Sequence, residues 1–126
     1  MEALPGLALL DGYAAYRAEG EMCFEDAIGL AGRVIAYCRE RGIERVLLDG
    51  RRLSGFGPLD ATDRFRLSEE MARAARATVK VAIVVRPELL SLDLFGVMVA
   101  RNRGLFTNSF ASEVEAVAWL KDPNAT

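Results

Sequence analysis

The sequence contains no histidine among its 126 residues and only two cysteines, Cys23 and Cys38. Without histidine, a single chain cannot build a Ser-His-Asp triad, a histidine general base or a histidine-ligated metal site. The two cysteines match no zinc-binding pattern and do not make a disulfide scaffold. We expect them to be free, buried thiols. We therefore expect no metal and no cofactor, and we identify no catalytic residue.

An excess of positive charge and a long apolar run are also missing. The net charge is −2, which argues against nucleic-acid binding because that needs a basic surface. The most apolar stretch, residues 89–100, is interrupted by Ser91, Asp93 and Gly96, and it is too short for a bilayer span of about 20 residues. The first residues lack the basic region of a secretory signal. We expect a cytoplasmic protein without a transmembrane segment.

What the chain does contain is the pattern of one α/β domain covering residues 1–126. Residues 7–10 and 13–18 flank Asp11-Gly12, which predicts a tight β-hairpin. Residues 24–41 repeat apolar side chains every three or four positions, and this spacing predicts a helix that stops at Gly42. A short buried strand follows at residues 45–49, and a Gly-rich, doubly basic loop follows the strand.

The second half of the chain continues the alternation. A helix is predicted near residues 60–77, with Asp60 or Thr62 as its cap and a strand after it at 79–85, covered on both faces. A third helix should begin at Ser91 or Asp93 and run to about Asn102. A last strand at 104–110 precedes a helix with a Ser112/Glu115 capping box. In the helix near 60–77, the side chains expected to face the core are Leu67, Met71, Ala74 and Ala75, and those expected to face water are Arg64, Arg66, Glu69, Glu70, Arg73 and Arg76.

The predicted order of elements is β-β-α-β-α-β-α-β-α. Strands that alternate with helices at this spacing require right-handed crossovers and a mostly parallel sheet. The opening hairpin makes the sheet mixed. The predicted fold class is thus α/β, with a single mixed, mostly parallel five-stranded sheet flanked by four helices.

Several segments together carry a family resemblance: a hairpin that closes at Gly20, the strand RVLLD before a Gly/Ser loop, the strand KVAIVV, and the ending FASEVEAVAWL. Over essentially the whole chain, the sequence resembles small bacterial SpoIIAA-like proteins, whose fold is similar to STAS domains and to the lipid-binding domain of Sec14-type proteins. The resemblance implies a cytoplasmic protein without enzymatic activity that acts by binding partners.

The same resemblance suggests an alternative function at Ser54. Anti-sigma-factor antagonists of the STAS type are phosphorylated on a serine in the loop before the second helix, within a context like Asp-Ser-Ser-Gly-Leu. Here that loop reads Leu-Ser-Gly-Phe-Gly-Pro from position 53, without the preceding aspartate or the serine pair. A phospho-regulated antagonist switched at Ser54 is therefore an alternative hypothesis.

The loop after the strand at 45–49 is the first candidate binding site. Two guanidinium groups, backbone N–H groups and a following helix N-terminus suit an anion or a partner's carboxylate. The residues concerned are Arg51, Arg52, Ser54 and Gly55. The competing interpretation is a solvated loop whose glycines only make turns. Asp49, at the strand end, is expected to bind nearby N–H groups; a second alternative makes it the centre of a small hydrolase or phosphotransfer enzyme.

The apolar helix near residues 89–99 is the second candidate site. It has no polar face, whereas a surface helix normally shows a polar stripe. Either the fold covers it, or its outer face, with Leu94, Val97 and Met98, contacts a second subunit, an apolar ligand or a membrane surface. The leading hypothesis is a non-enzymatic binding or regulatory domain that binds a partner protein or a small apolar or anionic ligand. We also expect a homodimer.

Overall fold

The computed structural model describes residues 4–57 and 59–125, and within these ranges the side chains of residues 91–96 are not described. The described chain confirms the expected α/β class, with a five-stranded mixed sheet and four α-helices. In chain order the elements are β1 (Leu7–Leu10), β2 (Tyr13–Glu21), α1 (Phe24–Glu40), β3 (Arg45–Ser54), α2 (Ala61–Ala75), β4 (Lys80–Val84), the 3₁₀ turn η1 (Pro87–Leu89), α3 (Leu90–Asn102), β5 (Phe106–Phe110) and α4 (Glu113–Lys121).

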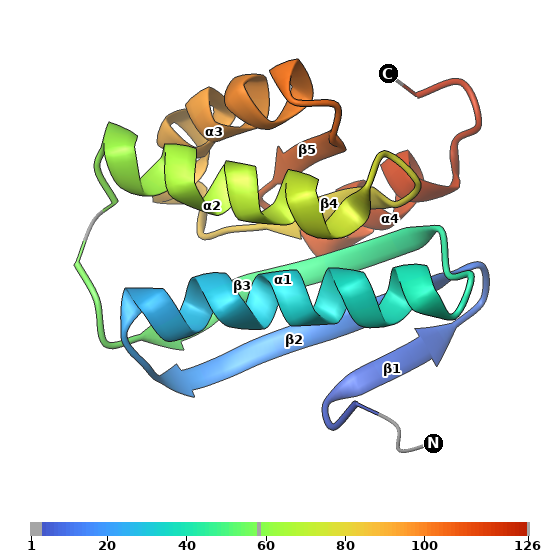
Figure 1. The fold of residues 1–126 in the computed structure, drawn as a ribbon, viewed down its shortest axis with the longest axis horizontal. Coiled ribbons are helices and arrows are strands. Elements are labelled where there is room, and N and C mark those ends of the chain that lie inside the picture. Colours follow the sequence, from blue (N-terminus) through green and yellow to red (C-terminus); the bar gives the residue numbers. More distant parts are fainter. Residues whose placement is uncertain (1–3, 58, 126) are drawn as a thin grey trace.

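The strands stand in the sheet in the order in which they occur in the chain, β1-β2-β3-β4-β5. The β1–β2 pair is antiparallel, and the other three pairs are parallel. Each parallel connection therefore moves one place across the sheet in the same direction. Because such connections share one handedness, α1, α2 and α3 lie side by side on the same face (Figure 1). Helix α4 packs alone on the opposite face, against β3, β4 and β5.

The sheet consequently separates two apolar clusters. The larger cluster joins α1, α2 and α3 to the sheet face on which Val46 and Val81 lie. The smaller one joins Ala116 and Leu120 of α4 to the opposite face, where Leu47 lies. Alternate residues of β3 and β4 thus point into different clusters, as the pleat requires. Burial on both faces explains why these two strands consist almost entirely of apolar residues up to Asp49 and Val84.

Strand β3 is longer than predicted. It continues through Ser54, so residues 50–54, which we expected to form a loop, belong to the sheet. The reason is that β2 also runs on, to Glu21, and pairs with the extension. Between the pairs Arg17–Asp49 and Glu19–Arg52, β3 advances by one residue more than β2. This shift is a bulge in β3, and a strand pattern read from alternation alone does not reveal it.

The helix ends follow local chemistry, with one exception. Of the two expected caps of α2, Asp60 is the one observed, in a reciprocal capping box with Asp63. The Ser112 hydroxyl accepts the N–H of Glu115 at the start of α4. The prediction that Ser91 or Asp93 opens the third helix is wrong, because α3 begins at Leu90. Proline at the first position of η1 starts a 3₁₀ turn that leads directly into the helix.

Lys80 binds the C-terminal end of α4. Its ammonium group donates to the carbonyl oxygens of Trp119, Leu120 and Asp122 at 2.7, 3.3 and 3.1 Å. These carbonyls lie at the C-terminus of α4, where the helix dipole favours a cation. The same ammonium lies 4.5 Å from the centre of the Trp119 ring. A single side chain of β4 therefore satisfies the last turn of the only α-helix on this face of the described sheet.

Replacing Lys80 with Met tests this anchor. We expect Lys80→Met to lower the free energy of unfolding by about 1–3 kcal/mol, because three carbonyl groups lose a charged donor. The matched control is Lys121→Met, which removes the same charge from an exposed position of α4 and should change stability by less than about 0.5 kcal/mol. Urea denaturation measures both. Equal effects of the two variants would contradict the anchoring role of Lys80.

Candidate functional site

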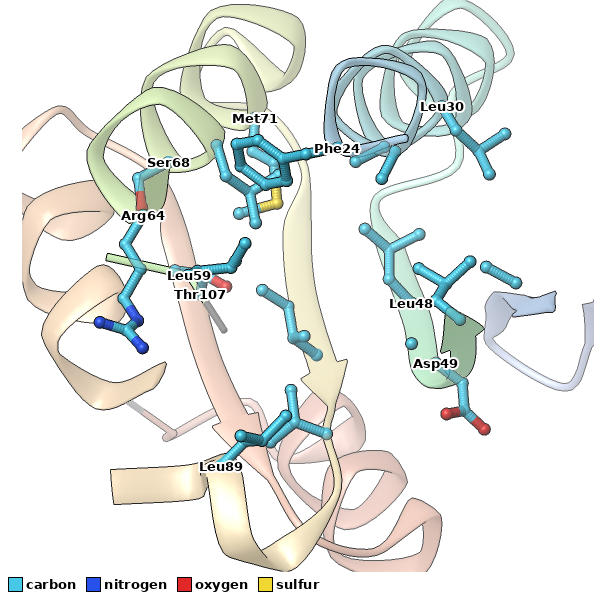
Figure 2. Close-up of a pocket in the computed structure, with 18 of the residues that line it drawn as sticks. Phe24, Leu30, Leu48, Asp49, Leu59, Arg64, Ser68, Met71, Leu89 and Thr107 are labelled. Carbon is cyan, nitrogen blue, oxygen red and sulfur yellow. The ribbon is translucent and has the colours of Figure 1, made fainter. Parts of the chain in front are cut away.

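A partly open cavity of about 330 Å³ lies between the sheet and the layer formed by α1, α2 and α3 (Figure 2). It is placed where β2, β3 and β4 end and where α1 and α2 begin. Side chains from these elements and from η1, α3 and β5 line it. In open α/β sheets, ligands bind outside the carboxyl ends of the strands. The present cavity differs from such a crevice, because it lies between the face of the sheet and the helices that cover it.

Small side chains on α1 leave this space open. Ala27 and Ala31 line the cavity one turn apart, and the larger Phe24, Leu30 and Val34 line it beside them. An alanine side chain fills much less volume than a leucine or a valine, so these two positions occupy little of the space between α1 and the sheet. Water in such a space meets mostly apolar walls, so its replacement by an apolar group is favourable.

The end of β3 and residues that follow it line one side of the cavity. Leu53 belongs to β3, and Phe56 and Leu59 come after the strand. The Phe24 and Phe56 rings are in tilted contact with centres 5.7 Å apart. Gly55 makes the turn, with φ +105°. A Cβ at this position would lie 2.4 Å from the carbonyl oxygen of Met22, so only glycine fits this conformation without rearrangement. Gly55, predicted as a binding residue, thus has a clear role in shaping the turn before Phe56.

Polar side chains lie among the apolar ones, and they include Asp49, Arg64, Ser68, Arg86 and Thr107. Thr107 is fully buried and donates to the Val81 carbonyl oxygen at 2.8 Å. Arg64 is half-buried and lines the cavity. The prediction that it faces water is therefore wrong. Its position follows from helix geometry, since Arg64 stands four and seven residues before Ser68 and Met71, on the stripe that faces the sheet.

The predicted anion site does not form as one pocket. The Arg51 guanidinium donates two hydrogen bonds to the Asp49 carboxylate, at 3.0 and 2.8 Å. Arg52 is mostly exposed and lies 4.0 Å from the Glu19 carboxylate. Ser54 is also exposed, with its hydroxyl 3.4 Å from the Gly20 carbonyl oxygen. Of these predicted residues, the cavity touches only Asp49.

Asp49 is buried, and both of its carboxylate oxygens accept hydrogen bonds from Arg51. Its carboxylate also accepts the backbone N–H of Arg51 at 3.0 Å, as the expectation that it binds nearby N–H groups requires. Burial by itself raises the pKa of this carboxyl. Hydrogen bonds from the Arg51 side chain and backbone, together with the charges of Arg51 and Arg17, outweigh burial, so the pKa lies below its ordinary value. Asp49 is therefore ionised at neutral pH and paired.

The predicted residues of the apolar helix divide between two environments. Val97 is buried and lines the cavity, whereas Met98 is 65% exposed on the outside of α3. The Leu94 side chain lies outside the described residues. The helix is thus partly core, and its exposed part includes Met98.

The cysteines also differ from each other. Cys38 is buried, and burial raises its pKa to about 11, which keeps the thiol protonated and unreactive. Cys23 is exposed, so the expectation that both thiols are buried is wrong for this residue. It precedes Phe24 as the cap residue of α1, and its position outside the helix explains the exposure.

Most of the cavity lining was not identified from the sequence. Leu53, Phe56 and Leu59 lie in the same Gly-rich segment as the predicted polar site residues. Their regular spacing of three residues could have indicated that they face a common apolar space. Arg64 was available from its place on the stripe with Met71. The cavity itself carries no sequence signal, because it is a volume that three helices and a sheet leave unfilled.

A scan against models of known protein families and a search of curated proteins both find no match for this chain. Function is therefore inferred from the cavity, its lining and its charges. In the part of the chain that the structure describes, no cluster of three or more carboxylates or thiols is arranged to hold a metal ion. No helix of that part is long and apolar enough to span a membrane.

The pairing of Asp49 predicts a stability that depends on pH. We expect Asp49→Asn to be less stable than the parent by about 1–3 kcal/mol at neutral pH, because Arg51 loses its charged acceptor. A lowered pKa in the folded state contributes stability that is complete above the unfolded value of about 4 and is lost as pH falls through the folded value. The difference should therefore shrink in acid. Urea denaturation at several pH values measures it, and a difference independent of pH would contradict the prediction.

Val97 and Met98 provide a second test because they are neighbours in different environments. We expect Val97→Asp to lower the free energy of unfolding by about 3 kcal/mol or more, since it buries a charge without a partner. Met98→Asp should change stability by less than about 0.5 kcal/mol. Thermal and urea unfolding of both variants and of the parent measure these changes in stability. Sedimentation of Met98→Asp also tests the homodimer, because a dimer formed through this face would become a folded monomer.

Proposed function

We propose that this chain is a non-enzymatic binding domain that holds a small, mainly apolar molecule between its sheet and its three-helix layer. The observation that carries the proposal is the cavity of about 330 Å³, lined mostly by aliphatic and aromatic side chains. Ligand pockets in proteins typically measure about 300–1,000 Å³ and combine apolar walls with a few polar groups. The cavity matches this description in size and in lining.

The size of the cavity supports a molecule larger than a few waters. An engineered apolar cavity of about 150 Å³ is enough to bind benzene, and the present one has about twice that volume. Its walls come from three helices and from four strands, β2 to β5. A bound molecule would therefore contact both the helical layer and the sheet. Binding to the folded state alone also raises stability by mass action.

The side chains favour binding over catalysis. A hydrolase or phosphotransferase built on Asp49 would need a free carboxylate next to a reacting group. The carboxylate oxygens of Asp49 instead accept hydrogen bonds from Arg51. Among the described cavity residues, no nucleophile stands beside a base. The enzymatic alternative therefore has less support than the binding hypothesis.

The family resemblance agrees with a binding role and stays a proposal. Membership of the SpoIIAA-like group, a cytoplasmic location, a partner protein and a homodimer all remain predictions from the sequence. Ser54 is exposed at the end of β3, where a kinase would have access to it, and a phosphorylation switch at Ser54 also remains a prediction.

Filling the cavity tests the proposal directly. The parent protein should bind the uncharged fluorescent probe N-phenyl-1-naphthylamine, whose emission rises in apolar surroundings. We expect Ala31→Phe to weaken this binding by at least about tenfold, which corresponds to about 1.4 kcal/mol, because the new ring occupies the space. Fluorescence titration measures the affinity, and circular dichroism melting verifies that the variant is folded.

The matched control is Ala118→Phe, which adds the same ring to an exposed position of α4 on the other face of the sheet. It should bind the probe like the parent. If Ala31→Phe is folded and binds as tightly as the parent, the probe lies elsewhere and the cavity is not the site. Absence of any probe binding by the parent would also contradict the proposal.

A further inference from the structure

Arg64 places a permanent positive charge at an apolar cavity. It belongs to the first turns of α2, is half-buried, and its side chain forms part of the cavity wall. Figure 2 shows it extending from α2 beside Leu59 and Thr107, with the guanidinium at its far end. No carboxylate of the described side chains pairs with it. A cation beside apolar walls is stabilised by an anionic partner.

The other charges near the cavity are already compensated or directed outward. Asp49 lies on the opposite side from Arg64, with its carboxylate turned away from the interior (Figure 2), where Arg51 neutralises it. Arg86 also touches the cavity, but it is exposed and lies 3.9 Å from the Glu88 carboxylate. Elsewhere on α2, Arg66 pairs with Glu25 and Arg73 with Glu70. Arg64 thus differs from these neighbouring arginines in having no acidic partner among the described residues.

From this arrangement we infer that the molecule bound in the cavity is amphipathic, with an apolar body against α1 and the sheet and one anionic group, a carboxylate or a phosphate ester, bound by Arg64. The inference rests on the proposed function and adds the chemical class of the ligand. The planar guanidinium donates two parallel N–H bonds to such an oxygen pair. The apolar walls around it strengthen the interaction relative to water.

Two probes with the same chain and different ends test this inference. Decanoate and decanol compete with N-phenyl-1-naphthylamine for the purified protein at neutral pH, and fluorescence gives both affinities. We expect decanoate to bind roughly 10-fold to 100-fold more tightly than decanol, as a hydrogen bond between charged groups predicts. Arg64→Met keeps the length of the apolar stem and should remove this preference while leaving decanol binding unchanged.

The matched control is Arg73→Met, which makes the same substitution on α2 at a mostly exposed side chain that does not line the cavity. It should keep the preference for decanoate. Equal binding of decanoate and decanol by the parent, or a preference that survives in Arg64→Met, overturns the inference while the proposed cavity function stands. If the parent binds the probe and neither compound displaces it, the inference is also overturned. If the parent does not bind the probe at all, the proposed function itself fails.

Discussion

The fold depends on one constraint: all three parallel connections cross the sheet in the same direction. Because they share one handedness, α1, α2 and α3 must lie on the same face. A doubly wound sheet reverses its strand order and opens a crevice at the reversal. The parallel order of this sheet, β2-β3-β4-β5, has no reversal, so its binding space forms in a different way. It lies between the sheet and a helical layer that does not fill the sheet's whole width with large side chains.

Ion pairs occur on both faces of the sheet. On the α4 side, ions are paired: the Arg17 guanidinium holds the Glu113 carboxylate at the start of α4 with two bonds of 3.0 and 2.9 Å, and Arg51 holds Asp49. On the three-helix side, Arg64 touches the cavity without a described acidic partner. Ion pairs also occur on the three-helix side, where Arg66 pairs with Glu25 and Arg73 with Glu70. Arg64 differs from these arginines because no described carboxylate pairs with it.

Local signals in the sequence predicted much of the fold. Asp11-Gly12 predicted the hairpin, Asp60 the cap of α2, and the apolar run around Val81 an interior strand, because each depends on neighbouring residues alone. The extension of β3 was missed because it depends on pairing with β2, and the start of α3 because Pro87 opens a 3₁₀ turn first. For the site, Asp49 and Val97 were identified as candidates and do line the cavity. Arg64 was assigned to solvent, since its charge was weighed above its place on the helical stripe.

The isolation of α4 has a consequence for how the molecule opens. Its apolar residues share no cluster with those of the other helices, and its contacts cross long stretches of chain, 96 positions from Arg17 to Glu113. Proteins open locally in contiguous units, and we expect α4 to open separately from the three-helix layer. Opening of α4 would expose Ala15, Leu47 and Ala82, whereas the residues that line the cavity belong to other elements.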